Sequence, residues 1–230
     1  MGRRVFLGVL GLGALGIAFG ARAQAALEPA LAAAEMHDPT GLLATLLPGG
    51  NSFRYYSVTG GVEHRDGADY ALSVSGLVDT PGHHTLADLQ GMPQTSLTRD
   101  FQCVTGWRVP DVLWSGVRLS HLLDLAGPTS DATAVRLTSF DGAYSESLTL
   151  DQARRDDVLV ALRMLDGPVT HDHGGPVRLY VAPMYGDKSL KWLSGIELTA
   201  QVRPGYWEDR GYDVDAWVGR SNGRDDDSTS

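Results

Sequence analysis

Turn-forming residues interrupt the apolar segments of this chain at short intervals, and this spacing limits the folds that the chain can adopt. Its 230 residues include 28 glycines and 11 prolines. Between them lie short segments such as residues 70–78, in which apolar and polar side chains alternate as in a strand with one buried face. A coiled coil is therefore excluded, and we expect many short elements rather than long helices.

The same patterns predict a domain in which strands outnumber helices. Residues 117–125 have apolar side chains at helical spacing, followed by Gly127-Pro128 as a stop signal. Single helical turns are expected at 86–89 and at 150–156. Strands are expected at residues 70–78, 101–105, 134–138, 145–150, 158–164, 177–181 and 192–202, with a turn at Asp141-Gly142.

The first 25 residues have the layout of an export signal. Arg3-Arg4 precedes an apolar run over 5–19, and overlapping A-x-A cleavage sites follow at 21–25. The paired arginines resemble the twin-arginine motif, so we expect export of the folded protein by the twin-arginine machinery. An ordinary secretory signal or an uncleaved anchor is the alternative. The expected location is the periplasm or the outer face of the cytoplasmic membrane.

The remaining chain is expected to form one domain. Residues 26–50 are predicted as a linker with a short helix, residues 51–219 as the domain, and the polar residues 220–230 as a disordered tail. The formal net charge of −9 argues against a protein that binds nucleic-acid backbones, so no nucleic-acid partner is expected.

Common catalytic and metal-binding motifs are missing from the sequence. It has no G-x-S-x-G elbow, no H-E-x-x-H and no P-loop, and its single cysteine excludes an intrachain disulfide. His171 and His173 could bind zinc or copper if they lay on a strand. The sequence Gly174-Gly175-Pro176 that follows them favours a tight turn instead. A non-catalytic exported metal-binding module remains the alternative from a different class.

Cys103 is the residue whose surroundings suggest chemistry. A lone cysteine is usually a small buried hydrophobe. Here it follows a short apolar strand and precedes Arg108, Trp114 and Arg118, and cationic neighbours favour the thiolate. A thiolate is a soft ligand, so the residues are compatible with a soft, redox-active metal.

Several segments around Cys103 resemble one known family. The sequence FQCVTGW at 101–107 and the segments at 114–127, 172–198 and 205–217 are similar to the molybdopterin-dependent oxidoreductases of the sulfite oxidase family. The resemblance implies an α+β, strand-dominated mixed fold, that of the sulfite oxidase molybdopterin-binding domain. It also implies a Mo-molybdopterin cofactor with one molybdenum per chain.

The resemblance assigns roles to individual residues. Cys103 is expected to be the protein ligand of molybdenum. In the D-H-G-x-P-V-R segment, His173 and Arg178 are expected to contact the pterin and its phosphate. Further expected cofactor contacts are Ser189, Leu190 and Lys191 around the phosphate and, more loosely matched, Phe53, Arg54, Tyr55, Tyr56, Trp114, and Ser139 or Asp141. These residue types suit a phosphate, because arginine and lysine supply charge and turns supply backbone N–H groups.

Two cations are expected to face the substrate. Sulfite oxidases surround the metal with arginines that hold anionic sulfite, and Arg108 falls on one such position. Lys188 falls on another, where it keeps the charge of the arginine but loses the bidentate fork. The resemblance therefore places both residues in the catalytic group together with Cys103.

The function implied is transfer of an oxygen atom to or from a small sulfur-centred substrate, sulfite-like or sulfoxide-like. Electrons would be exchanged singly with a cytochrome or a membrane haem protein. No haem is expected in this chain, because no length remains for a b-type haem domain. A periplasmic methionine-sulfoxide or S-/N-oxide reductase is the main enzymatic alternative, favoured by the export signal and by the ending G-Y-W-E-x-R-G-Y.

Overall fold

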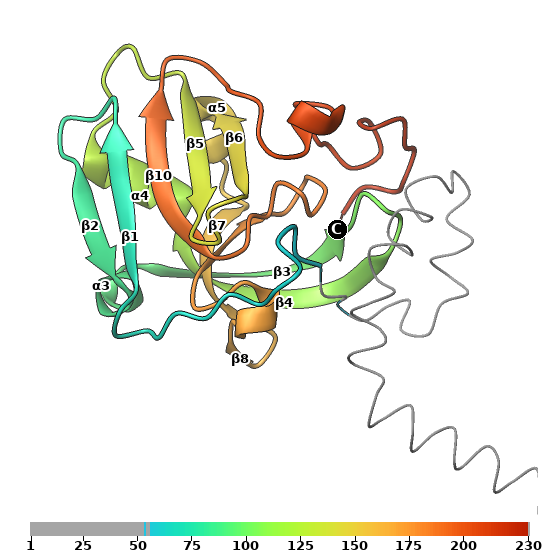
Figure 1. Cartoon of the computed structure of the whole chain (residues 1–230), viewed down its shortest axis with the longest axis horizontal. Coiled ribbons are helices and arrows are strands. Elements are labelled where there is room, and N and C mark those ends of the chain that lie inside the picture. Colours follow the sequence, from blue (N-terminus) through green and yellow to red (C-terminus); the bar gives the residue numbers. More distant parts are fainter. Residues whose placement is uncertain (1–52, 54–55, 230) are drawn as a thin grey trace, which may run out of the picture.

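Strands with alternating buried and exposed side chains form the first of two β-sheets (Figure 1). The computed structural model describes Phe53 and residues 56–229; the expected signal at 1–25, the expected linker at 26–50, Arg54 and Tyr55 lie outside these described residues. Strands β1 and β10 run parallel, and the other neighbours are antiparallel. The sheet order is β2 (Gly82–Thr85), β1 (Ala71–Gly76), β10 (Leu193–Thr199), β5 (Ala134–Ser139), β6 (Ser145–Thr149).

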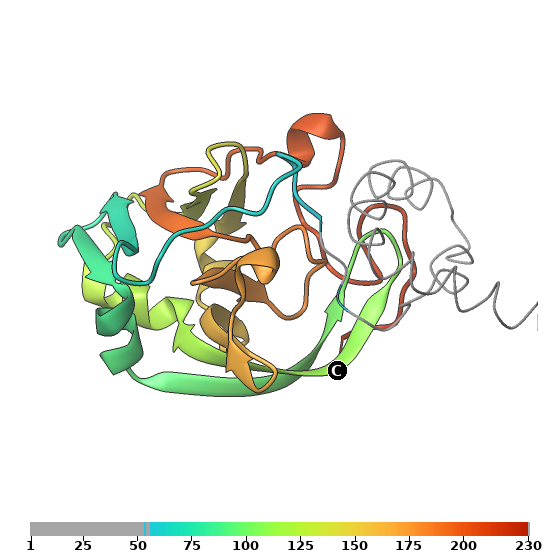
Figure 2. The ribbon, with the colours of Figure 1, turned by 60° about the horizontal axis from the view of Figure 1, so that its bottom comes forward.

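The second sheet is antiparallel and carries a long hairpin. Strand β7 pairs with β4 on one side and with both β8 and β9 on the other. Its strands are β3 (Gln94–Gln102), β4 (Arg108–Arg118), β7 (Val158–Met164), β8 (Gly167–Pro168) and β9 (Arg178–Val181). The β3–β4 hairpin extends beyond the rest of the sheet toward the C-terminal segment (Figure 2).

One apolar core joins the two sheets. Leu72 and Ile196 from the first sheet pack with Val160 from the second and with Leu122 of helix α4, all fully buried. A second cluster, around Trp114, is formed by side chains of the long hairpin together with side chains of β7 and β9. The short helices are α3 (Leu86–Gly91), α4 (Leu119–Ala126), α5 (Leu150–Ala153), η1 (His171–His173) and η2 (Glu208–Arg210). In the part of the chain that the structure describes, no helix is long and apolar enough to cross a membrane.

The strand-dominated α+β class is confirmed. The secondary structure predicted from the sequence differs most from the structure in the segment that forms β4. The sequence predicts no strand over 108–116 and starts a helix at 117, whereas β4 continues to Arg118 and α4 begins at Leu119. Pro110 and Asp111, which resemble a turn, lie where the β3–β4 register shifts. A bulge tolerates both residues, and pairing with β3 and β7 overrides the local signal.

The C-terminal residues also differ from the expected disordered tail. The segment 221–229 runs back along the domain to the tip of the β3–β4 hairpin (Figure 1). Tyr185 donates a hydrogen bond to Asp226 at 2.7 Å, and the Thr229 hydroxyl donates one to the Ala182 carbonyl at 2.8 Å. These polar side chains find partners in the domain, which composition alone does not reveal.

Gly116 sets the approach of β4 to β7, and its replacement tests this packing. A Cβ added at Gly116 would lie 2.1 Å from the Val160 carbonyl oxygen, whereas one at Gly91 would meet nothing within 4 Å. We expect Gly116→Ala to lower the free energy of unfolding by about 1–3 kcal/mol. The matched control Gly91→Ala should be neutral or slightly stabilising. Equal denaturation midpoints for the two variants would contradict this packing.

Candidate cofactor and active site

Cys103 lies in the tight turn that joins β3 to β4. Its backbone N–H donates to the Trp107 carbonyl at 2.9 Å, and its carbonyl accepts from Gly106 at 3.0 Å. Gly106 has a φ of +104°, a conformation that side chains other than hydrogen disfavour. The Cys103 thiol is half-exposed and lies 3.2 Å from the Thr105 hydroxyl. The turn therefore presents the thiol at the end of a rigid hairpin.

Arg108, predicted to bind an anionic substrate, is instead held by protein groups. Its Nε donates to Gln102 at 2.6 Å and one terminal nitrogen pairs with Asp100 at 3.2 Å. The terminal nitrogens also donate to the backbone carbonyls of Asp227 and Ser228. The guanidinium thus fastens the C-terminal segment to the hairpin, and its charge is balanced by a carboxylate.

Of the two other expected neighbours of Cys103, Arg118 lies far from the thiol, whereas Trp114 belongs to the apolar cluster against which Cys103 packs. Arg118 lies at the opposite end of β4, ten residues from Arg108 and therefore roughly 33 Å away along an extended strand, where it pairs with Asp156. Trp114 is fully buried and stacks on Tyr180 with ring centroids 4.2 Å apart. Arg118 is therefore not part of a cationic cluster around the thiol, whereas Arg108 pairs with Gln102 beside Cys103.

Arg178 forms the centre of a second group of predicted residues. It is 3% exposed, and its guanidinium donates to three backbone carbonyls: Leu179 at 3.3 Å, His173 at 2.8 Å and Ser189 at 2.7 Å. No carboxylate of the described residues pairs with it within 4.0 Å. Burial lowers the pKa of Arg178 to about 10, so the guanidinium stays charged at neutral pH.

His173 and Lys191 lie close to this buried cation. Burial lowers the pKa of the His173 imidazole; Asp172 opposes that shift, and Arg178 and Lys191 add to it. Gly174 allows the close approach, because a Cβ there would lie 2.6 Å from the Lys191 side chain. The Lys191 ammonium donates to the Tyr56 carbonyl. Three nitrogen-bearing side chains from separate segments thus converge.

Ser189 contacts this group through its backbone carbonyl, and the side chains of Ser189 and Leu190 are occupied within the protein. The Ser189 hydroxyl accepts from the Val181 N–H at 3.0 Å, and Leu190 is buried with its carbonyl bonded to Leu179 at 2.8 Å. Phe53 completes one side, with its ring 5.3 Å from His173 and 5.2 Å from Phe101. The structure therefore brings the expected contacts Phe53, Tyr56, His173, Arg178, Ser189, Leu190 and Lys191 into one region.

Ser139 lies at the end of β5, beside Leu193 of β10, and Asp141 lies in the turn that follows. Ser139 accepts from the Asp141 N–H at 3.1 Å, and Asp141 accepts from Ala143 and Tyr144, both at 2.9 Å. Both side chains thus close the β5–β6 turn. Trp114 remains near the cofactor region through Arg178, whose guanidinium carbon lies 5.4 Å from its ring. The buried Trp114 indole nitrogen has no hydrogen-bond partner in the described residues.

Lys188, the second predicted substrate cation, is also occupied. It is 1% exposed and donates to Glu146 at 2.7 Å and to Glu208. Burial opposes a charged lysine, but Glu146 and Glu208 raise the pKa of Lys188 above its usual value. The ammonium therefore joins β6 to η2, and two carboxylates surround it.

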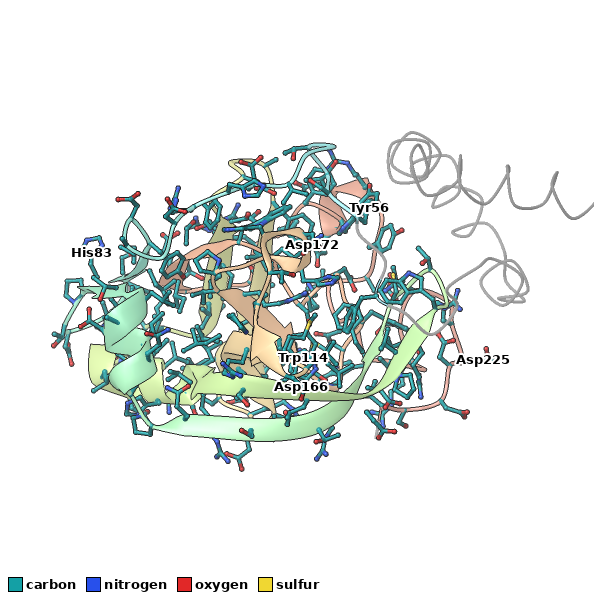
Figure 3. All side chains as sticks on the ribbon, turned by 90° about the horizontal axis from the view of Figure 1, so that it is seen from below. Tyr56, His83, Trp114, Asp166, Asp172 and Asp225 are labelled. Atoms are coloured by element: carbon teal, nitrogen blue, oxygen red, sulfur yellow. The ribbon has the colours of Figure 1, made fainter. Side chains whose placement is uncertain are left out.

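Two aromatic side chains near Cys103, Trp207 and Tyr212, are not among the site residues predicted from the sequence. Burial raises the pKa of Tyr212 to about 12, and the nearby Asp187 and Cys103 contribute to this shift. Trp207 packs against Tyr212 and Tyr56, with centroid distances of 5.1 and 5.9 Å. Figure 3 shows Tyr56 beside the segment that carries η2. The sequence signal for both is the ending G-Y-W-E-D-R-G-Y, which contains Trp207 and Tyr212.

These residues fit a cofactor that carries a phosphate and a metal. Arg178 is a buried cation paired with carbonyls alone, so a phosphate would supply the missing negative charge. Cys103 offers one accessible thiol of the type that binds soft metals. Nowhere among the described residues do three or more His, Cys, Asp or Glu side chains converge to hold a metal ion.

Comparison with known sequences identifies the class. A family model described as an oxidoreductase molybdopterin binding domain matches residues 59–207. The uncharacterized oxidoreductase YuiH of Bacillus subtilis (strain 168) is 36% identical over 156 residues, which cover 67% of this chain and 78% of YuiH. The chain therefore belongs to the molybdopterin-binding oxidoreductases and is an enzyme. Within that class it is a member of the sulfite oxidase family, with a Mo-molybdopterin cofactor.

Characterised relatives match over shorter shares of their length. Sulfite oxidase of Arabidopsis thaliana is 28% identical, and the match covers 62% of this chain and 45% of the relative. The methionine-sulfoxide reductase catalytic subunit MsrP of Campylobacter jejuni is 29% identical, with 61% and 52% covered. The chain thus spans about half the length of these two enzymes.

The structure of the sulfane dehydrogenase SoxCD from Paracoccus pantotrophus has the same fold. Its TM-score is 0.59 at 22% sequence identity, and the match covers 67% of this chain and 46% of that chain. Family membership also overturns the alternative of a non-catalytic binding module. His171 and His173 lie on η1, as the expected turn suggested, and the His171 ring packs 4.5 Å from His64.

Arg178 offers a test of cofactor binding. Arg178→Lys keeps the positive charge but loses the two-pronged hydrogen bonding of the guanidinium. A hydrogen bond to a charged group contributes about 1.5–3 kcal/mol, so we expect the molybdenum bound per chain to fall by about tenfold. Arg163→Lys, on the exposed part of β7, is the matched control. Elemental analysis of both proteins gives the answer. Full molybdenum content in Arg178→Lys would show that Arg178 does not hold the phosphate.

Proposed function

We propose that this protein is an exported oxidoreductase that removes the oxygen atom from an uncharged sulfoxide-type substrate. One Mo-molybdopterin per chain supplies the oxygen-transfer chemistry, with Cys103 as the protein ligand. Electrons come from a haem protein, either a cytochrome or a membrane partner. Residues 1–25 direct the protein through the twin-arginine route to the periplasm or the outer face of the membrane.

The observation that carries this proposal is the neutralisation of both expected substrate cations. Arg108 is bound by Asp100 and by the C-terminal backbone, and Lys188 lies between Glu146 and Glu208. Neither charge remains available for an anion such as sulfite. A neutral S=O group needs no cationic pocket, so this arrangement favours a sulfoxide.

The aromatic side chains near Cys103 support the same substrate class. Tyr212, Trp207 and Tyr56 pack against one another, and Tyr56 is 38% exposed. The thiol influences the pKa of both tyrosines, so this aromatic group borders the Cys103 turn. Sulfur makes favourable contacts with aromatic rings, and such a surface suits the thioether part of a sulfoxide. The match to MsrP provides independent support.

Cofactor retention and substrate binding would then be divided between two regions. Arg178, His173 and Lys191 hold the phosphate, with Ser189 and Leu190 supplying backbone around it. Cys103 and the aromatic group face the substrate. The hairpin turn orients the thiol, because both of its backbone polar groups are hydrogen-bonded within the turn.

A comparison of two substrates tests the function. With loaded protein, reduced methyl viologen and methionine sulfoxide, we expect kcat/KM to exceed that for sulfite oxidation with ferricyanide by at least about tenfold, equal to about 1.4 kcal/mol. Protein made without molybdate is the control. Faster oxidation of sulfite would favour the sulfite-oxidising alternative, represented among the relatives by the Arabidopsis enzyme.

Cys103→Ser tests the assigned ligand. A hydroxyl is a poorer ligand for a soft metal than a thiolate. Loss of a residue that only supports a metal ligand typically costs about 10–100-fold, so loss of the ligand itself should lower turnover by more than about 100-fold. Because Cys103 is half-exposed, the variant should unfold at the same denaturant concentration as the wild type. Ser96→Ala, on exposed β3, is the control for surface substitution. Wild-type turnover in Cys103→Ser would overturn the assignment.

A further inference from the structure

Residues 221–229, which we call the strap, lie against the hairpin turn that carries Cys103. The segment passes beside the end of the β3–β4 hairpin (Figure 2). Gly106, in that turn, has no side chain, and a Cβ added there would lie 2.9 Å from a terminal guanidinium nitrogen of Arg224. The strap therefore packs directly on the turn that presents the thiol.

Side-chain hydrogen bonds hold the strap on the domain at two points. The hydroxyl of Tyr185, a fully buried residue, donates to Asp226 at 2.7 Å and accepts from the Gly219 N–H at 3.1 Å. The Thr229 hydroxyl donates to the Ala182 carbonyl at 2.8 Å. Hydrogen bonds to a carboxylate, such as the one to Asp226, are stronger than bonds between neutral groups. The strap is thus fixed in place beside the turn.

The strap also occupies the guanidinium of Arg108. Groups of the domain itself satisfy only part of this side chain, since Nε donates to Gln102 at 2.6 Å and one terminal nitrogen pairs with Asp100 at 3.2 Å. The strap accepts from both terminal nitrogens through the backbone carbonyls of Asp227 and Ser228, the latter at 3.4 Å. A guanidinium holds an oxyanion with N–H groups arranged as a fork, so these carbonyls take the donors that the oxygens of an anion would use.

The strap adds negative charge beside this cation. Asp225 and Asp227 are exposed, and neither pairs with a cation within 4.0 Å among the residues that the structure describes. Arg224 and Asp226 pair with each other at 2.7 Å and balance one another. Figure 3 shows Asp225 at the end of the molecule where the hairpin turns. An anion that approaches Arg108 would therefore meet negative charge as well as occupied donors.

We propose that the strap determines the substrate class of this enzyme by excluding anions from Arg108. This role rests on the proposed reduction of a neutral sulfoxide, because an enzyme that acts on sulfite would need the same cation free. With the strap in place, both terminal nitrogens of Arg108 are engaged by the protein. With the strap released, the outer edge of the guanidinium can bind an oxyanion beside the Cys103 turn. The strap thus acts through Arg108 and takes no part in the removal of oxygen.

Sulfate binding tests the strap without turnover, and isothermal titration calorimetry on the loaded protein measures its Kd. A chain that ends at Ser221 should bind sulfate at least about tenfold more tightly than the full chain, the gain expected from one hydrogen bond to a charged group. Adding Arg108→Gln to the shortened chain should abolish this gain, whereas Arg163→Gln, at an exposed position of β7, should leave it intact. Equal sulfate affinity in the full and the shortened chain would overturn the proposal, as would a gain that survives Arg108→Gln.

A point substitution tests the same role in the full-length chain. Asp226→Ala removes the acceptor of the Tyr185 hydroxyl and the partner of Arg224, so the strap should detach and the sulfate affinity should approach that of the shortened chain. Asp225→Ala is the matched control, because it removes the same charge from the adjacent exposed residue. It should leave the sulfate affinity near that of the wild type. Equal affinities in the two variants would mean that the bound strap does not exclude the anion, and the proposal would be wrong.

Steady-state kinetics separate the strap from the proposed function. In loaded protein, with ferricyanide as the electron acceptor, the shortened chain and Asp226→Ala should lower KM for sulfite by at least about tenfold. The kcat with methionine sulfoxide should stay near that of the wild type, and the molybdenum content of each variant corrects for loss of the cofactor. If the shortened chain gains sulfate binding but the full chain reduces no sulfoxide, the proposed function fails and the exclusion of anions by the strap stands. If the full chain reduces sulfoxides but the shortened chain gains no sulfate binding, the strap proposal fails and the proposed function stands.

Discussion

The buried ammonium of Lys188 connects three parts of the chain that surround the active site. Lys188 lies in the loop between β9 and β10. Its ammonium binds Glu146 on β6 and Glu208 on η2. Loss of one partner from a buried ion pair typically costs about 3–5 kcal/mol, because the other charge is left without compensation. The position of η2, and with it Trp207 and Tyr212, therefore depends on this one cation.

Arg178 is buried as deeply as Lys188 but is neutralised differently. Its fork binds carbonyls of three segments, so the guanidinium orders the loops and keeps its net charge. Lys188 pairs with two carboxyl groups, so its positive charge is balanced within the protein. The same sequence block thus contains one cation suited to a phosphate and one that is structural. The difference arises from what packs on each side chain and not from the residue type.

This difference also explains which predictions from sequence succeeded. Strands β5 and β7 follow from local alternation and short apolar runs and are confirmed. The roles of Cys103 and Arg178 come from the family resemblance and stay predictions. The roles of Arg108 and Lys188 depend on partners far along the chain. Asp227 lies 119 residues from Arg108 and Glu146 lies 42 residues from Lys188. A local pattern holds no information on such contacts, and strand β4 was missed for the same reason.

The carboxyl groups around Lys188 give a physical reason why the substrate region should differ from a site that binds an anionic substrate. Glu146 and Glu208 both pair with Lys188, so the cation that a sulfite-binding enzyme would direct at its substrate is neutralised here. A lysine neutralised by two carboxyl groups offers little electrostatic attraction to an anionic substrate. Burial raises the pKa of the neighbouring Asp187 to about 7, and Glu208 adds to this shift. A region in which Lys188 is neutralised by its own protein partners is better suited to a neutral substrate than to an anionic one.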